Sequence, residues 1–212
     1  MYYRLKDLFN QYMREHLVYY ILIIFMFFAG IVTGALLVKT LPAVQVEELN
    51  RHLSYYFVGF NSENFLQHQV ILRESLVQNF KYLFIIWLSG ASLLGFPLIF
   101  LILFLRGFVL GFTVGFLVDQ IAVKGMLFSI AAILPHYIFI IPALFIAGVT
   151  GVSYAYKMIK LRISGRKYDF GQMFMNYSFT IFFACLFVLL AGFIEAYITP
   201  VFISFIIPMI NM

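Results

Sequence analysis

The chain has 212 residues, of which 64% are hydrophobic, 20% are aromatic and only 11% are charged. This composition leaves too few polar side chains to cover the surface of a soluble domain, which excludes that class. The formal net charge of +5 does not indicate nucleic-acid binding, because the basic residues follow a membrane-orientation pattern. We therefore expect an all-α, polytopic membrane protein that consists of one domain, residues 1–212.

Five membrane passes are expected along the chain. Four of them are stretches without charged residues, at 17–38, 82–105, 125–156 and 170–194. Each reaches or exceeds the roughly 20 residues that a transmembrane helix needs. The fifth is expected from Arg106 to Val123, with Arg106 at one interface and Asp119 near the other. The charged N-terminal stretch shows no small-residue cleavage site, so we expect the first pass to be retained.

The distribution of basic residues predicts the orientation of these passes. With the N-terminus inside, nine of the fourteen basic residues lie in the cytoplasm. The positive-inside rule therefore favours an inner N-terminus and an outer C-terminus. The densest basic cluster belongs to the predicted cytoplasmic loop at 157–169, where it also suits anionic lipid headgroups.

Two segments outside the passes are expected at the outer surface. In the loop at 39–81, apolar residues recur at helical spacing on either side of the turn-like sequence GFNSEN, which predicts two short amphipathic helices. The tail at 196–212 is apolar but is interrupted by Pro200 and Pro208. We expect this tail to lie along the outer membrane interface.

The fourth pass, 125–156, contains Pro135 and Pro142 and is longer than one perpendicular helix needs. A kinked helix, or a re-entrant half-helix followed by a crossing helix, fits this sequence. His136 lies beside the first proline and has two interpretations. In one it is a functional group, acting as a proton relay, a ligand contact or the partner of a carboxylate. In the other it is a neutral histidine that bonds to carbonyl groups freed by the prolines.

Glycines recur at four-residue spacing in two of the passes. The stretch RGFVLGFTVG carries three of them on one helix face, and GIVTG carries two. Such faces let helix backbones approach closely, so they predict packing surfaces. The partner helix belongs either to the same chain or to a second copy, in which case a homodimer forms. The glycines concerned are Gly30, Gly34, Gly107, Gly111 and Gly115.

Polar residues at the outer ends of the passes form a second candidate site. Asp119, Lys124 and Glu195 map to these ends, and together with His136 they are candidates for lining an outer groove or docking a partner. The alternative is that each of them is a helix-end charge in the headgroup layer.

Sequence signatures of catalysis and of cofactor binding are missing. The chain has no Gly-rich phosphate loop, no His-Glu-x-x-His motif and no nucleophile elbow. Its four histidines are scattered, which argues against a metal site, and the single cysteine, Cys185, excludes an intrachain disulfide. We expect no enzyme activity, no cofactor and no metal ion.

Three stretches carry a family resemblance: QNFKYLFIIWLSGASLLGFPLIFLILFLRGFVLGFTVGFLVDQ, LPHYIFIIPALFIAG and GFIEAYITP. In this order they resemble the stage II sporulation protein M family of spore-forming, Gram-positive bacteria. The resemblance extends from Tyr2 to about Pro200. The positions that match the motif of the family are Asn79, Arg106, Gly107, Gly111, His136, Pro142, Glu195 and Pro200.

The resemblance implies a noncatalytic membrane subunit of the engulfment machinery, located in the mother-cell membrane at the sporulation septum. Such proteins organise two peptidoglycan-degrading enzymes, the stage II sporulation proteins D and P. The wider family commonly has a glycine and a glutamate where this chain has Tyr137 and Ile140, and this departure favours scaffolding over transport. The expected partners are these two enzymes and membrane lipid. A channel or permease built around His136 is the alternative function.

Overall fold

The computed structural model describes residues 2–60, 68–92, 95–164 and 170–210. Within these ranges the fold is helical and contains no strand, so the predicted all-α fold is confirmed. The elements in chain order are α1 (Tyr2–Val38), α2 (Ala43–Phe60), α3 (His68–Ala91), α4 (Phe96–Ser164), α5 (Phe170–Phe193), the π-helical turn η2 (Ile194–Ile198) and α6 (Thr199–Ile210).

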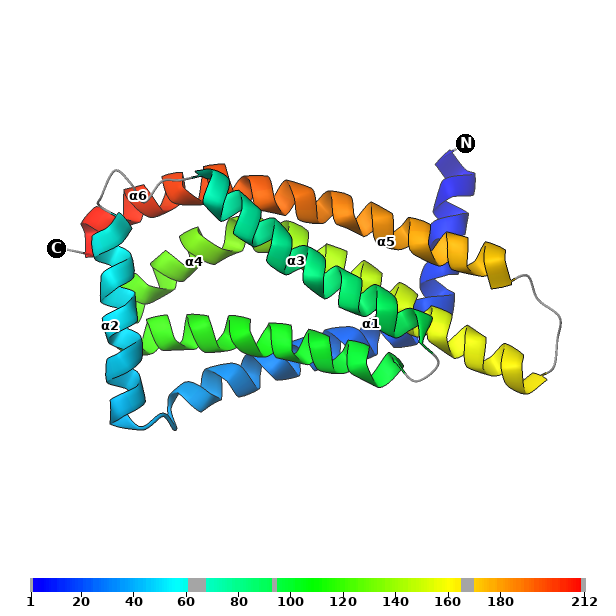
Figure 1. Ribbon diagram of the computed structural model, residues 1–212, viewed down its shortest axis with the longest axis horizontal. Helices are drawn as coiled ribbons and strands as arrows, with labels where there is room; N and C mark the ends of the chain where they lie inside the picture. Colours follow the sequence, from blue (N-terminus) through cyan, green and yellow to red (C-terminus); the bar gives the residue numbers. More distant parts are fainter. Residues whose placement is uncertain (1, 61–67, 93–94, 165–169, 211–212) are drawn as a thin grey trace.

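The α4 helix consists of two arms that fold back on each other (Figure 1). Backbone dihedral angles leave the helical region at Ile121 (φ −128°, ψ 19°) and Ala122 (φ 48°, ψ −126°). The first arm therefore covers 96–120 and the second arm covers 123–164. Within the described residues, Ala122 alone among non-glycine residues has a positive φ. This conformation strains an L-residue.

The long helices run side by side along one axis of the molecule. α3, the two arms of α4, α5 and the later part of α1 follow this axis, whereas the first part of α1 and α2 lie across opposite ends (Figure 1). The opposite end holds the beginning of α1, the beginning of α5 and the last turns of the second arm, which carry Lys157, Lys160 and Arg162. We call these the α2 end and the basic end. The arrangement agrees with the predicted orientation, in which the N-terminus and the basic cluster share the cytoplasmic side.

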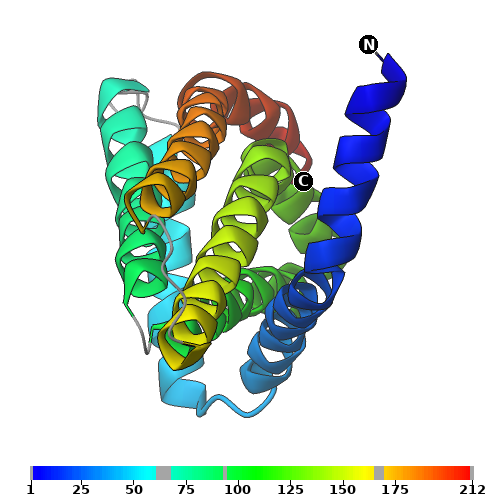
Figure 2. The ribbon, with the colours of Figure 1, turned by 90° about the vertical axis from the view of Figure 1, so that its right-hand side faces the viewer.

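The second arm of α4 forms the centre of the bundle. Seen from the basic end, it lies between α1 on one side and α3 with α5 on the other (Figure 2). Its residues Ala143, Leu144 and Ala147 are almost completely buried, together with Leu83 of α3 and Val188 of α5. The core of the molecule is therefore built around this arm.

Three stretches of the described chain are long and apolar enough to cross a membrane: His16–Val38, Phe96–Ser164 and Phe170–Ile206. The middle stretch provides two passes because it folds back at 121–122. α3 lies alongside these helices (Figure 1), but it is not apolar enough to count among the stretches that could cross a membrane. It carries the charged residues Arg73, Glu74 and Lys81.

The predicted second and third passes have different boundaries in the structure. The charge-free run 82–105 is not one helix, because α3 ends and α4 begins within it. Gly95 marks this turn, since a Cβ atom there would overlap the backbone of Ser89. Pro97 follows in the first turn of the new helix, where its missing N–H is not needed. Arg106 consequently lies near the middle of the first arm and not at an interface, so that prediction was wrong.

The predicted outer loop at 39–81 is correspondingly shorter. Its first amphipathic helix corresponds to α2, where Asn50 Nδ2 donates a hydrogen bond to Gln120 Oε1 at the end of the first arm (2.7 Å). The second predicted surface helix is instead the first half of α3, which belongs to the bundle. The GFNSEN turn falls mainly outside the described residues. In the C-terminal tail, Ile203 of α6 is buried with Leu117.

Pro135 and Pro142 do not interrupt the second arm. Non-helical dihedral angles inside α4 occur only at 121–122, so the break expected at the prolines lies at the hairpin instead. A proline removes one backbone N–H donor. Within a membrane bundle, neighbouring helices can accommodate the carbonyl group that loses this donor.

The predicted glycine faces pack against each other within the chain. A Cβ atom added to Gly111 would overlap the carbonyl oxygen of Ile31 in α1, and one added to Gly34 would overlap that of Phe108 in α4. α1 and the first arm of α4 therefore run parallel in direct backbone contact. A homodimer through these glycines would require an exposed glycine stripe. The stripe is instead covered within the chain. We call this contact the glycine seam, formed by Gly30, Gly34, Gly107, Gly111 and Gly115.

Candidate functional site: a polar network and a charged helix face

Polar side chains from three elements form a hydrogen-bonded chain inside the bundle. Ser75 of α3 donates its hydroxyl hydrogen to the carboxylate of Glu195 in η2. One turn further along α3, Asn79 Nδ2 donates to the backbone carbonyl oxygen of Ser75 (2.9 Å). The side-chain oxygen of Asn79 accepts a hydrogen bond from the Arg106 guanidinium in the first arm of α4. We call Ser75, Asn79, Arg106 and Glu195 the polar network.

The polar network is largely withdrawn from the surface. Ser75 and Asn79 are buried, and Arg106 and Glu195 are half-buried. The Arg106 guanidinium carbon lies 3.9 Å from the centroid of the Tyr82 ring, a cation–π contact that further stabilises its charge. Ionised side chains inside a membrane bundle require such partners. The network therefore holds one positive and one negative group between α3, α4 and η2, linked by two neutral side chains.

His136 of the second arm completes this cluster. Its side chain is buried, and the charges of Glu195 and Arg106 both act on it. Nδ1 of His136 and Nε of Arg106 are buried and have no hydrogen-bond partner among the described residues. Both interpretations of His136 stay predictions, because among the described residues its Nδ1 atom bonds neither to the Glu195 carboxylate nor to a carbonyl group freed by the prolines.

Glu195 lies in the π-helical turn η2. Such turns are rare and frequently occur at functional sites. The next residue, Ala196, places its carbonyl oxygen 2.7 Å from Nδ1 of His68, which must donate because a carbonyl oxygen only accepts. The His68 ring also stacks on Tyr197 with a centroid separation of 5.1 Å. These contacts fix the beginning of α3 against η2.

The four outer polar residues predicted from the sequence are divided between two places. Glu195 and His136 lie in the cluster around Arg106. Asp119 and Lys124 lie instead on either side of the α4 hairpin, and both are exposed. The carboxylate of Asp119 accepts a hydrogen bond from the side chain of Gln120 (2.9 Å).

Sequence reasoning assigned Ser75 and Asn79 to an outer loop and gave Ser75 no role. A signal for their burial is nevertheless present, because Ser75, Asn79, Leu83 and Ile86 recur at helical spacing and are all buried in α3. This periodicity continues from the predicted loop into the predicted pass. It indicates one helix where charge counting indicated a boundary.

The opposite side of α3 carries a row of polar side chains. Arg73, Glu74 and Lys81 alternate with amides, and all of them are exposed. Val70 and Val77, which lie between them, are also exposed. We call this row the charged face of α3, formed by Gln69, Arg73, Glu74, Gln78 and Lys81.

The charged face lies at the same level as apolar side chains of the neighbouring helix. His68 bonds to Ala196 near one end of α3, and Trp87 Nε1 donates to Ser178 Oγ near the other (3.1 Å). These two bonds fix the antiparallel register of α3 against α5 and η2. The part of α5 between them exposes large apolar residues: Phe182, Phe183, Leu186, Leu190 and Phe193. On this side the charged face is therefore flanked by the exposed apolar side chains of α5.

The structure also bears on metal and thiol chemistry. Within its described residues, no group of three His, Cys, Asp or Glu side chains lies close enough to hold a metal ion. Cys185 is a free, half-buried cysteine of α5.

Long apolar helices around two half-buried charges of opposite sign, Arg106 and Glu195, define the class of this molecule as a polytopic helical membrane protein. The chain belongs to the stage II sporulation protein M family, whose profile matches residues 23–200. Comparison with curated proteins and with solved structures found no match. The family identifies a sporulation-related membrane protein, and it is not known as a family of enzymes. Four of the positions for which the sequence suggested a motif match, Asn79, Arg106, His136 and Glu195, lie in one cluster.

Proposed function

We propose that the protein is a noncatalytic membrane scaffold that holds the peptidoglycan-degrading sporulation proteins D and P at the septal membrane of the mother cell during engulfment. The observation that supports this proposal most strongly is the charged face of α3. The protein contributes the binding platform, and its partners break the cell-wall bonds. Family membership indicates sporulation as the cellular process. The charged face of α3 indicates that the contact is with a polar or charged helix of a partner.

The charged face is unsuited to lipid. Inserting an Arg or Lys at the centre of a membrane helix costs about 2.5–3.5 kcal/mol on translocon scales. Arg73 and Glu74 carry opposite charges near one end of α3, whereas Lys81 lies two turns further along the helix from Glu74. A partner transmembrane segment that carries a carboxylate at the level of Lys81 satisfies this surface. A second copy of the same face is a poor fit, because it would bring two Lys81 side chains together.

A scaffold also needs a rigid body behind its binding surface. The glycine seam holds α1 to the first arm of α4, and the polar network holds α3 to α4 and η2. α3 is thus fixed on its inner side while its outer side remains exposed. This combination supports a preformed docking surface.

The alternative function, a channel or permease around His136, requires a continuous polar path. The polar network extends from Glu195 to Arg106, near the middle of the bundle. Beyond it, toward the basic end, the described core is apolar, with Ile99, Leu144 and Ala147 at 0–2% exposure. The next buried polar contact is that of the Tyr177 hydroxyl, which donates to the carbonyl oxygen of Ile86 (3.2 Å), and the contact of Ser153 with His16 (2.9 Å) follows it. This apolar layer speaks against a conducting path.

Co-purification from detergent tests the scaffold directly. Full-length protein co-expressed with proteins D and P is expected to recover at least one of them. Lys81→Leu is expected to reduce this recovery several-fold, although the change makes the isolated protein easier to accommodate in lipid. Phe183→Leu, at the same level on the exposed face of α5, is the matched control and is expected to leave recovery unchanged.

Two outcomes would contradict the proposal. Failure of the folded wild-type protein to recover either enzyme would remove its basis. Flux of small solutes through reconstituted liposomes, abolished by His136→Ala or Glu195→Ala, would favour the channel instead.

A further inference from the structure

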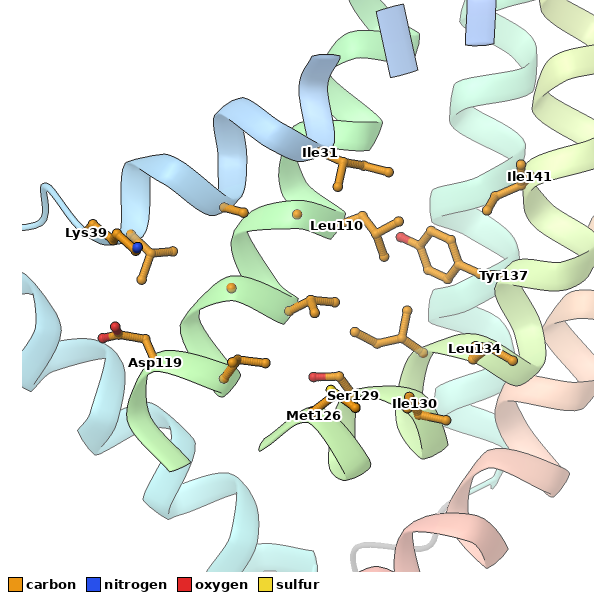
Figure 3. A pocket seen from close by; sticks show the side chains of 17 residues that line it. Ile31, Lys39, Leu110, Asp119, Met126, Ser129, Ile130, Leu134, Tyr137 and Ile141 are labelled. Carbon is orange, nitrogen blue, oxygen red and sulfur yellow. The ribbon is translucent and has the colours of Figure 1, made fainter. Parts of the chain in front are cut away.

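An apolar groove lies between α1 and the two arms of α4 (Figure 3). Its volume is about 590 Å³, within the range of ligand-binding pockets. Ile31, Leu110, Val114 and Leu134 are among the apolar side chains that line it. Polar groups with a formal charge occur only at the α2 end, where Lys39 and Asp119 face the opening. The groove is therefore amphipathic along its length.

On α1 and on the first arm, the lining of the groove is close in length to one leaflet of a bilayer. It extends from Ile31 to Lys39 and from Leu110 to Asp119, which is about 12 Å and about 14 Å at 1.5 Å per residue. On the second arm it extends from Met126 to Ile141, about 22 Å, and so continues past this level. The hydrocarbon core of a membrane is about 30 Å thick, so one leaflet contributes about 15 Å. A partner helix would need a groove that continues through both leaflets. A lipid chain ends within its own leaflet and fits this dimension.

The charges at the opening select the headgroup. Lys39 follows the end of α1 and Asp119 lies at the end of the first arm, so both lie at the α2 end of the groove, where the predicted orientation puts the outer headgroup layer. Within the described residues, no ion pair joins Lys39 to Asp119. The ammonium group of Lys39 suits a phosphate, and the carboxylate of Asp119 suits a cation that can donate hydrogen bonds.

We propose that this groove binds a phosphatidylethanolamine-type lipid of the outer leaflet. One acyl chain lies between α1 and the two arms, the phosphate contacts Lys39, and the primary ammonium donates hydrogen bonds to Asp119. A purely anionic headgroup leaves Asp119 facing negative charge. A quaternary choline headgroup carries a positive charge but has no N–H to donate. The proposal is independent of the scaffold function, since it concerns a different face of the bundle.

Lipid retention measured by native mass spectrometry tests this site. Full-length protein in detergent is titrated with phosphatidylethanolamine, phosphatidylcholine and phosphatidylglycerol that have identical acyl chains. The wild type is expected to retain phosphatidylethanolamine several-fold better than the other two. Asp119→Asn is expected to abolish this preference, and Lys39→Gln is expected to weaken binding of all three lipids. Lys157→Gln, which removes the same charge at the basic end, is the control and should change nothing.

A groove-filling variant locates the acyl chain. Leu110→Trp is expected to lower retention of every lipid, with helicity checked by circular dichroism. Asp119 and Lys39 are exposed, so their variants are expected to retain the fold. They keep the test decisive even if Leu110→Trp fails to fold. Equal retention of the three headgroups by the wild type, or an unchanged preference in Asp119→Asn, would overturn the proposal.

Discussion

The first arm of α4 is held on two sides by opposite means. Toward α1, Gly107 and Gly111 bring two backbones into contact without any side chain between them. Toward α3, the adjacent residue Arg106 reaches out with a long side chain to Asn79 and Tyr82. Burial of apolar surface does not drive helix association in lipid, so packing and polar bonds must do so. The glycine seam depends on shape, whereas the polar network depends on charge balance.

The largest effect is expected from adding atoms to the glycine seam. Gly111→Leu forces α1 and the first arm apart, because even a Cβ atom overlaps the Ile31 carbonyl oxygen. We expect a loss of about 3 kcal/mol or more in the free energy of unfolding, measured by denaturant titration in detergent. Gly115→Ala is the graded comparison: its Cβ atom would lie 3.0 Å from Ala35 Cα, and its effect should be near zero. Equal effects of the two changes would show that close backbone contact does not hold this seam.

An intermediate effect is expected from removing one charge of the polar network. Arg106→Met leaves the Glu195 carboxylate without a compensating charge and should destabilise the fold by about 2 kcal/mol. In the double variant with Glu195→Gln, the total loss should be smaller than the sum by about 1 kcal/mol. The exposed Arg162→Met is the control, with a change within about 0.5 kcal/mol. Strict additivity in the same unfolding assay would mean that the two charges are not coupled.

The smallest effect, and one of opposite sign, is expected at the hairpin that joins the two arms of α4. Ala122→Gly relieves the strain of a positive φ (48°) and should raise the free energy of unfolding by about 1 kcal/mol. Ala132→Gly, inside the second arm, should lower it by about the same amount, because glycine disfavours a helix interior. A loss of stability in both variants would contradict the hairpin geometry.

The glycine seam and the network differ in how far the sequence predicts them. Small residues at four-residue spacing require only a helix to form a face, so the packing role of Gly30, Gly34, Gly107 and Gly111 follows from local pattern. The network brings together residues 120 positions apart, such as Ser75 and Glu195. The role of its neutral members, Ser75 and Asn79, becomes visible only when the folded structure brings them between Arg106 and Glu195. Glu195 and His136 could be singled out beforehand because ionisable groups in apolar stretches are uncommon.

The boundary errors have the same origin. Charge-free length locates a pass only if every charge marks an interface, and Arg106 breaks this assumption because it has partners inside the bundle. α3 is missed for the converse reason, since its charged face hides the buried periodicity of Ser75, Asn79 and Leu83. The apolar groove is beyond sequence reasoning altogether. It depends on the angle at which the second arm of α4 folds back from α1 and the first arm.

The position of Glu195 in the polar network has a consequence for biosynthesis. The helices emerge from the ribosome in chain order, at about 5–20 residues per second, so Ser75 and Asn79 wait on the order of ten seconds before Glu195 is made. During this interval the two arms of α4 are made, and the positive charge of Arg106 does not yet have the Glu195 carboxylate to balance it. Arrival of the last pass closes the bundle. A chain truncated before Glu195 would therefore keep an uncompensated Arg106 charge inside the membrane, a feature that membrane quality control could detect.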